Sequence, residues 1–166
     1  MHVRDVVEIV SGLEAAGVAV WVDGGWCVDA LVGRQTRDHD DLDIAIGRGD
    51  EQSLRDWFHA RGYLGVARSD RSPWNFVLGS TGGRLVDVHV FEFDEQGELV
   101  YGVEYPKDSL TGSAVLGGVT VRCIAPEWMF RFKTSYPPAQ KDRADVRALH
   151  EKYGFEIPPG RRFLGP

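Results

Sequence analysis

Residues 18–46 constrain the fold more than any other stretch of the chain. The run VAVWV at 18–22 is apolar and rich in β-branched residues, which predicts a short buried strand. Gly24-Gly25 breaks this run, and residues 26–32 then read as a short helix. After a polar loop, the run LDIAI at 42–46 predicts a second strand. A strand, a glycine pair, a helix and a strand in this order predict a core that combines helices with a β-sheet.

Two aspartates at the start of the second strand carry the chemical argument. Asp41 and Asp43 are two residues apart, so strand alternation sends both side chains to the same face. Two carboxylates this close repel each other unless a cation lies between them. Mg²⁺ prefers hard oxygen ligands and often keeps substrate phosphates in its coordination shell. Acidic pairs also occur on solvated strand starts, so the interpretation depends on a further acidic residue elsewhere in the chain.

That further acidic residue occurs in the alternating stretch RLVDVHVF at 84–91. Its valines share one face, which predicts the core side, and Asp87 shares the other face with His89. If this strand pairs with the strand that begins at Asp41, Asp87 completes a cluster of three carboxylates. Such a cluster can hold metal ions for an in-line displacement at phosphorus. Two alternatives stay open: Glu92 as the third acid, although alternation places it on the valine face, and His89 as a base near neutral pH.

The glycine pair suggests a phosphate site. Gly24 and Gly25 follow a strand and precede a helix, where bare backbone N–H groups and the helix N-terminus favour an anion. Arg34, Arg37 and His39 lie between this turn and the aspartates and are placed to contact a triphosphate. The alternative interpretation is that these three are solvated loop residues.

The remaining patterns extend the sheet and add helices toward the end of the chain. They predict helices at 6–16, 51–60 (with Asp50 as the N-cap), 127–135 and 140–153, strands at 63–67, 74–78 and 84–93, and hairpin turns at 94–97 and 117–118. We therefore expect an α+β fold, a small mixed β-sheet flanked by helices with a helical C-terminal portion. Residues 1–105 are expected to form the core. Residues 106–166 are expected to form a mixed, then helical, portion that closes the cleft within one compact unit.

Charge and composition limit the classes of partner that the chain is expected to bind. The net charge of −6 disfavours nucleic acid, which usually meets a basic face, and suits a cationic small molecule. The sequence has no apolar run long enough to span a membrane and does not begin like a signal peptide, so we expect no membrane partner and a cytoplasmic location. Cys27 and Cys123 lack the spacing of metal ligands and are expected to be buried thiols.

Taken together, these pieces resemble a known pattern. The stretch from Gly24 to Ile44 resembles the lincosamide and aminoglycoside-2″ nucleotidyltransferases of the polymerase β-like superfamily, in which a glycine turn and a short helix precede D-x-D on the next strand. Tyr136 and Asp142 stand where relatives have a similar Tyr-then-Lys-Asp run.

The resemblance implies a function and a set of site residues. Asp41 and Asp43 would be Mg²⁺ ligands, and Asp87 would be a third ligand, the general base for the acceptor hydroxyl, or both. Gly24 and Gly25 would support the triphosphate of ATP or another NTP, with Lys133 near a phosphate and Tyr136 against the base. A nucleoside monophosphate, most simply AMP, would move to a hydroxyl of a small molecule such as a lincosamide or aminoglycoside, and pyrophosphate would leave.

Other functions stay open from the sequence alone. A minimal nucleotidyltransferase can modify a protein or RNA in a toxin–antitoxin pair, and a degenerate relative can bind a nucleotide without turnover. A metal-dependent phosphohydrolase can use the same carboxylates. The acceptor, the choice of NTP, and whether the protein is a monomer or a homodimer are not set by these patterns.

Overall fold

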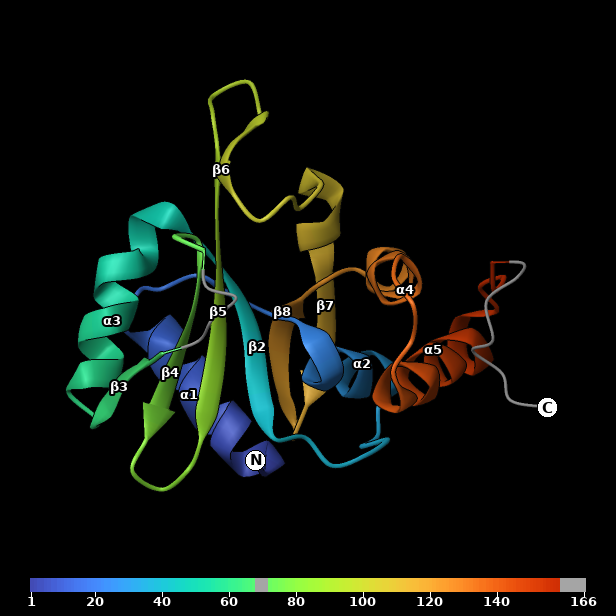
Figure 1. The fold of residues 1–166 in the computed structure, drawn as a ribbon, viewed down its shortest axis with the longest axis horizontal. Coiled ribbons are helices and arrows are strands. Elements are labelled where there is room, and N and C mark those ends of the chain that lie inside the picture. Colours follow the sequence, from blue (N-terminus) through green and yellow to red (C-terminus); the bar gives the residue numbers. More distant parts are fainter. Residues whose placement is uncertain (68–71, 159–166) are drawn as a thin grey trace.

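The computed structural model describes residues 1–67 and 72–158, and in this part of the chain one mixed eight-stranded sheet forms the centre of the molecule (Figure 1). The strand order is β3-β4-β5-β2-β1-β8-β7, and β6 pairs with the outer part of β5. The strands are β1 (Val20–Val22), β2 (Asp41–Gly47), β3 (Tyr63–Val66), β4 (Asn75–Ser80), β5 (Leu85–Phe93), β6 (Leu99–Gly102), β7 (Gly112–Leu116) and β8 (Val119–Cys123). The helices are α1 (Val3–Ala15), α2 (Gly24–Val32), α3 (Glu51–His59), α4 (Pro126–Thr134) and α5 (Gln140–Tyr153), with short 3₁₀ turns η1 (Arg48–Asp50) and η2 (Lys107–Thr111).

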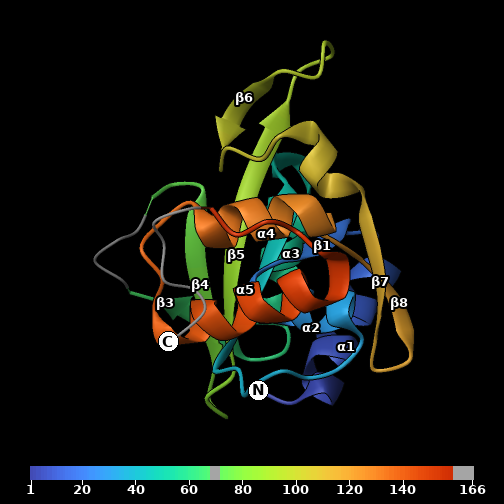
Figure 2. The same cartoon turned by 90° about the vertical axis from the view of Figure 1, so that its right-hand side faces the viewer.

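The helices cover both faces of the sheet. Helices α4 and α5 lie across one face, and α1 and α3 lie on the other, as the two perpendicular views agree (Figures 1 and 2). Helix α2 packs against β2 and against α5, so it links the sheet to the C-terminal helices. The expected α+β fold, a mixed sheet flanked by helices with a helical end, is therefore confirmed.

The pairing of β2 with β5 decides where the acidic residues meet. These two strands are parallel, and their register places Asp43 beside Asp87 and Ala45 beside His89. The valines of β5 are fully buried, whereas Asp87 and His89 alternate with them on the other face, and His89 shares a cavity with Met129 and Phe132 of α4. The alternation expected at 84–91 is thus present, and the strand expected to carry Asp87 does lie next to the D-x-D strand.

The sheet continues past residue 105, where the core was expected to end. The hairpin of β7 and β8 joins it, because β8 runs parallel to β1 with Val22 beside Cys123. Both cysteines are buried, as expected. None of the helices in the described residues is long and apolar enough to cross a lipid bilayer.

Local expectations needed correction at two helix starts. Helix α1 begins at Val3 instead of Val6, because the Asp5 carboxylate accepts a hydrogen bond from the backbone of His2 at 3.0 Å and stabilises the first turn. Asp50 stands at the N-cap position of α3, as expected, but its carboxylate makes no capping hydrogen bond there. It accepts the backbone N–H of Ala19 at 3.0 Å instead and joins η1 to the start of β1.

Candidate active site

Two carboxylates and an imidazole meet where β2 and β5 run side by side. Ligand atoms of Asp43, Asp87 and His89 all lie within 4.8 Å of one another. Each of the three side chains is partly buried, so their charges interact more strongly than they would in bulk water. Among the described residues this is the one group of such spacing, and the geometry of the parallel pair creates it.

The environment of Asp43 disfavours its charged form. Burial, and then the negative charges of Asp41 and Asp23, raise the pKa of Asp43 to about 6. Asp41 therefore acts on Asp43 across the shared face, as alternation predicted, although it is not one of the three residues whose ligand atoms cluster. An acidic site with this repulsion favours a bound cation.

His89 lies between acidic residues on both sides. Its Nε2 is 3.5 Å from Asp87 Oδ1, and its Nδ1 is 2.9 Å from the hydroxyl of Tyr105. Burial lowers the pKa of His89, but Asp87, Asp23 and Asp43 outweigh it and raise the pKa to about 9. The ring is therefore an imidazolium at neutral pH in the metal-free protein, which makes it a counter-ion to the carboxylates and a poor general base.

Asp23 and Tyr105 belong to the site although the sequence patterns did not identify them. Asp23 is the N-cap of α2: its Oδ1 accepts the N–H of Gly24 at 2.7 Å, and its Oδ2 accepts the hydroxyl of Tyr105 at 2.5 Å. Its backbone N–H donates to the carbonyl of Asp43 at 2.9 Å, which fixes the helix start against β2. An aspartate directly before a helix is a recognisable N-cap signal, so Asp23 was detectable. Tyr105 lies in an irregular connection with no such signal.

The glycine pair is the first turn of α2 and not a separate loop. Gly24 has φ +58°, a conformation that favours glycine, and a β-carbon there would lie 1.9 Å from Asp43 Oδ2. The β-carbon position of Gly25 instead faces the side chains of Arg37 and His39, at 2.5 and 2.4 Å. Gly24 thus lets the helix approach the acidic cluster, and Gly25 lets the preceding loop pack on the helix.

Gly24→Ala is expected to lower activity at least about 100-fold, because the added methyl group must displace the Asp43 carboxylate. Left-handed backbone at a non-glycine residue adds about 1 kcal/mol of destabilisation. Steady-state rates and urea unfolding measure the two effects separately. Gly33→Ala is the matched control, since Gly33 also has positive φ at the other end of α2 but has open space around it. Equal losses of activity in both variants would contradict the steric argument.

A cavity of about 470 Å³ opens above the acidic cluster. The sheet side contributes Asp43, His89, Asp23 and Gly24, and the helical side contributes Met129, Phe132, Lys133, Tyr136, Lys141 and Asp142, with Val103, Glu104 and Tyr105 from the connection after β6. Lys133 and Tyr136, which were expected at the site, therefore do line it together with Asp43 and Gly24.

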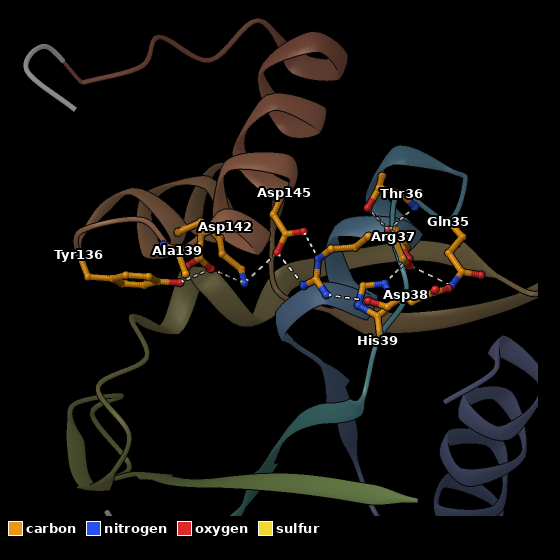
Figure 3. A network of polar contacts seen from close by, with 11 residues as sticks. Gln35, Thr36, Arg37, Asp38, His39, Tyr136, Ala139, Asp142 and Asp145 are labelled. Atoms are coloured by element: carbon orange, nitrogen blue, oxygen red, sulfur yellow. Dashed lines mark hydrogen bonds and ion pairs between the residues drawn. The ribbon is translucent and has the colours of Figure 1, made fainter. Parts of the chain in front are cut away.

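A chain of polar contacts ties the helical wall of this cavity to the loop before β2 (Figure 3). The hydroxyl of Tyr136 donates to Asp142 at 2.9 Å, and Lys133 contacts Asp142 at 3.4 Å and Asp145 at 3.0 Å. Asp145, which is fully buried, also receives two hydrogen bonds from Arg37, at 2.8 and 3.0 Å. The pKa of Lys133 is raised even though burial opposes this, because Asp145 lies so close.

Arg37 and His39 do not reach the cavity, which corrects the expectation that they contact a triphosphate. Arg37 is held by Asp145, and His39 is buried with its Nε2 2.5 Å from Asp29. His39 also packs on Trp26, with ring centroids 4.4 Å apart. His39 supports the loop from inside the protein, and the partly exposed Arg37 ties the loop to α5.

The two remaining candidates also lie outside the site. Arg34 is an exposed loop residue, as its alternative interpretation had it, and does not line this cavity. Glu92, the backup third acid, pairs with Arg48 at 2.8 Å on the exposed side. Asp87 is thus the β5 carboxylate that meets Asp43.

Comparison with solved structures places this fold among the nucleotidyltransferases. The lincosamide antibiotic adenylyltransferase LnuA, solved with lincomycin, superimposes with a TM-score of 0.76 at 23% identity, covering 88% of this chain and 94% of that one. ANT(2″)-Ia in complex with adenylyl-2″-tobramycin gives a TM-score of 0.72 at 23% identity, covering 90% of this chain and 87% of that one.

Sequence comparison then identifies the family. The model of the aminoglycoside-2″-adenylyltransferase family matches residues 5–149, and the chain belongs to this family of nucleotidyltransferases. A 2″-aminoglycoside nucleotidyltransferase of Klebsiella pneumoniae is 29% identical over 141 residues, which cover 79% of this chain and 74% of the relative. A lincosamide resistance protein of Staphylococcus haemolyticus is 24% identical over 151 residues, covering 88% and 92% of the two chains.

Proposed function

We propose that the protein transfers a nucleoside monophosphate, AMP from ATP, to a hydroxyl group of a small-molecule antibiotic in a reaction that depends on Mg²⁺. The observation that carries this proposal is the parallel pairing of Asp43 with Asp87, since Asp43 lines a cavity whose helical wall comes from α4 and α5. Family membership supports the reaction class, since relatives are named for nucleotidyl transfer to aminoglycosides and for lincosamide resistance.

The donor set fits Mg²⁺. Asp43 and Asp87 offer hard oxygen ligands within one cluster, and Asp41 adds charge on the same face. Burial, and then the charges of Asp41 and Asp23, raise the pKa of Asp43, and a bound cation would offset both effects. His89 fits a hard cation less well, and as an imidazolium it balances the carboxylates instead. When bound, Mg²⁺ would supply charge neutralisation on the phosphate oxygens.

The chain's own residues would bind and orient both substrates. Lys133 and Lys141 place positive charge beside the cavity for the triphosphate, and the half-exposed ring of Tyr136 offers a surface for the nucleobase. Asp87 would accept the proton of the acceptor hydroxyl as its oxygen attacks the α-phosphorus. A new bond forms between that oxygen and phosphorus, and the bond to the leaving pyrophosphate breaks.

The test is to incubate the purified protein with Mg²⁺ and ATP together with lincomycin or tobramycin, beside the Asp43→Asn variant. The proposal expects a mass gain of one AMP on the drug, equimolar pyrophosphate, and loss of both in the variant. Release of inorganic phosphate without a modified drug would replace the proposal with a phosphohydrolase.

Mg²⁺ binding is expected to depend on pH through Asp43. Its pKa of about 6 leaves the side chain partly protonated at pH 6, whereas a metal ion needs the carboxylate. The affinity for Mg²⁺ should therefore fall as the pH drops below about 6, approaching tenfold per pH unit, and level off at higher pH. Calorimetric titration in two buffers of different ionisation enthalpy would measure the released protons. A Mg²⁺ affinity that is constant between pH 5 and pH 7 would contradict the assignment of Asp43 as a ligand.

A further inference from the structure

Two segments of different chemistry, on opposite sides of α4, line the cavity and define its two ends. Lys141 lies in the first turn of α5, whereas Val103 and Glu104 lie in the connection that follows β6. Both views show this connection on one side of α4 and α5 on the other (Figures 1 and 2). Asp43 and His89 of the acidic cluster line the same cavity from the sheet.

The end next to α5 carries two lysines, of which Lys133 is paired with Asp142 and Asp145. Lys141 is exposed there and makes no ion pair within residues 1–67 and 72–158, while Lys133 shares the same wall. This end suits the triphosphate of the nucleotide. The acceptor must then approach the α-phosphorus from the other end, because the attack is in line with the leaving pyrophosphate.

Among the carboxylates that line the cavity, the one at the other end is not already engaged. Asp23 is occupied by Gly24 and Tyr105, and Asp142 by Lys133 and Tyr136. Asp43 is a proposed metal ligand. Glu104 is exposed at the rim and makes no hydrogen bond or ion pair with any described residue.

The wall around Glu104 is apolar. Val103 lies next to it in the chain, and Met129 and Phe132 project from α4 into the same cavity. Binding an apolar part of a ligand against this wall is favourable, by roughly 25 cal/mol of free energy for each Å² of apolar surface removed from water. A ligand with several ammonium groups would instead need a carboxylate for each group that loses its water.

We propose that the acceptor is a hydroxylated amphiphile with a single basic amine, and that Glu104 is the specificity-determining residue that receives this amine. This inference rests on the proposed nucleotidyl transfer and adds the class of acceptor to it. Amine recognition by Glu104 would orient the acceptor so that its hydroxyl faces Asp87.

Initial rates with lincomycin and tobramycin at saturating Mg²⁺ and ATP test the proposal. Lincomycin carries a single basic amine on an alkylated ring that is joined to a hydroxylated sugar, whereas tobramycin carries several amines on hydroxylated rings. We expect kcat/KM to be at least about tenfold higher for lincomycin. Glu104→Gln should raise KM for lincomycin by about tenfold and leave kcat and the KM for ATP unchanged. Asp108→Asn, which removes an exposed carboxylate outside this cavity, should change none of these values.

Two results would overturn the proposal: a preference for tobramycin, or an unchanged KM for lincomycin in Glu104→Gln. Modification of neither drug by a protein that still binds Mg²⁺ and ATP would overturn the acceptor class and leave the proposed nucleotide site intact. Failure to bind Mg²⁺ and ATP at all would remove the proposed function itself. Circular dichroism of Glu104→Gln verifies folding, which this exposed position should not disturb.

Discussion

Asp43→Asn is expected to lower the rate of nucleotidyl transfer by about 10⁴-fold or more, because it removes a ligand from a cluster that acts as a unit. The amide keeps the size of the side chain but cannot carry the negative charge that holds a cation beside Asp87. Single-turnover rates with saturating ATP measure the loss directly. Asp40→Asn is the matched control, since Asp40 precedes the same strand but is exposed. Turnover of Asp43→Asn within tenfold of the wild type would refute the role of Asp43.

The same substitution is expected to stabilise the metal-free protein. The pKa of Asp43 is raised to about 6 in the folded state, so its contribution to stability is present at low pH and is lost as pH rises through about 6. The variant cannot ionise at this position, so it escapes this destabilisation. At pH 8 its free energy of unfolding should exceed that of the wild type by about 1–2 kcal/mol, a figure reduced for the partial exposure of the side chain. Near pH 3, below the unfolded-state pKa of about 3.9, the difference should vanish. Urea unfolding in EDTA at both pH values measures it, and a variant that is less stable at pH 8 would contradict the burial argument.

Asp145→Asn is expected to destabilise the fold by about 2–4 kcal/mol, because it leaves Arg37 and Lys133 without their shared buried partner. The pKa of Asp145 is lowered, since Arg37 and Lys133 together outweigh the effect of burial. A lowered pKa means that the stabilisation is present above the unfolded-state pKa and is lost as pH falls through the folded-state pKa. The deficit should therefore persist across neutral pH and shrink only in strong acid.

The matched control for Asp145→Asn is Glu14→Gln, which breaks the exposed ion pair with Arg122. That pair should contribute less than about 1 kcal/mol. Urea unfolding of both variants compares a buried ion pair with an exposed one in the same protein. Equal and small losses would show that the contact chain of Figure 3 does little to hold α5 in place.

The acidic cluster was predictable because its causes are local. Alternation over two residues places Asp41 and Asp43 on one face, and alternation at 84–91 places Asp87 opposite the buried valines. A single further assumption, that the two strands are neighbours, brought Asp43 to Asp87, and the register confirms it. The assignments of Asp41, Asp43 and Asp87 as metal ligands, and of Asp87 as base, stay predictions that the variants above test.

The roles of Arg37 and His39 could not be read from their own surroundings. Arg37 contacts Asp145, which lies 108 positions away in the sequence, and no sequence pattern near residue 37 predicts that partner. His39 is satisfied by Asp29, whose place on the buried side of α2 depends on the packing of α5 and β7 against that helix. A charged loop between two functional motifs suggests ligand contacts. The same charged side chains can instead form ion pairs and hydrogen bonds within the folded protein.

The parallel contact between β1 and β8 also bears on how the chain acquires its structure. Val22 pairs with Cys123, so the middle of the sheet stays incomplete until about a hundred intervening residues have been made and threaded to their places. Contacts of such long sequence separation slow folding, because the chain loses conformational entropy on closing the loop before the strand pairing stabilises it. Until then the open edge of β1 offers unpaired backbone groups to other chains. We therefore expect refolding from urea to be slow and increasingly aggregation-prone with concentration, and a chain still emerging from the ribosome to depend on chaperones until β8 arrives.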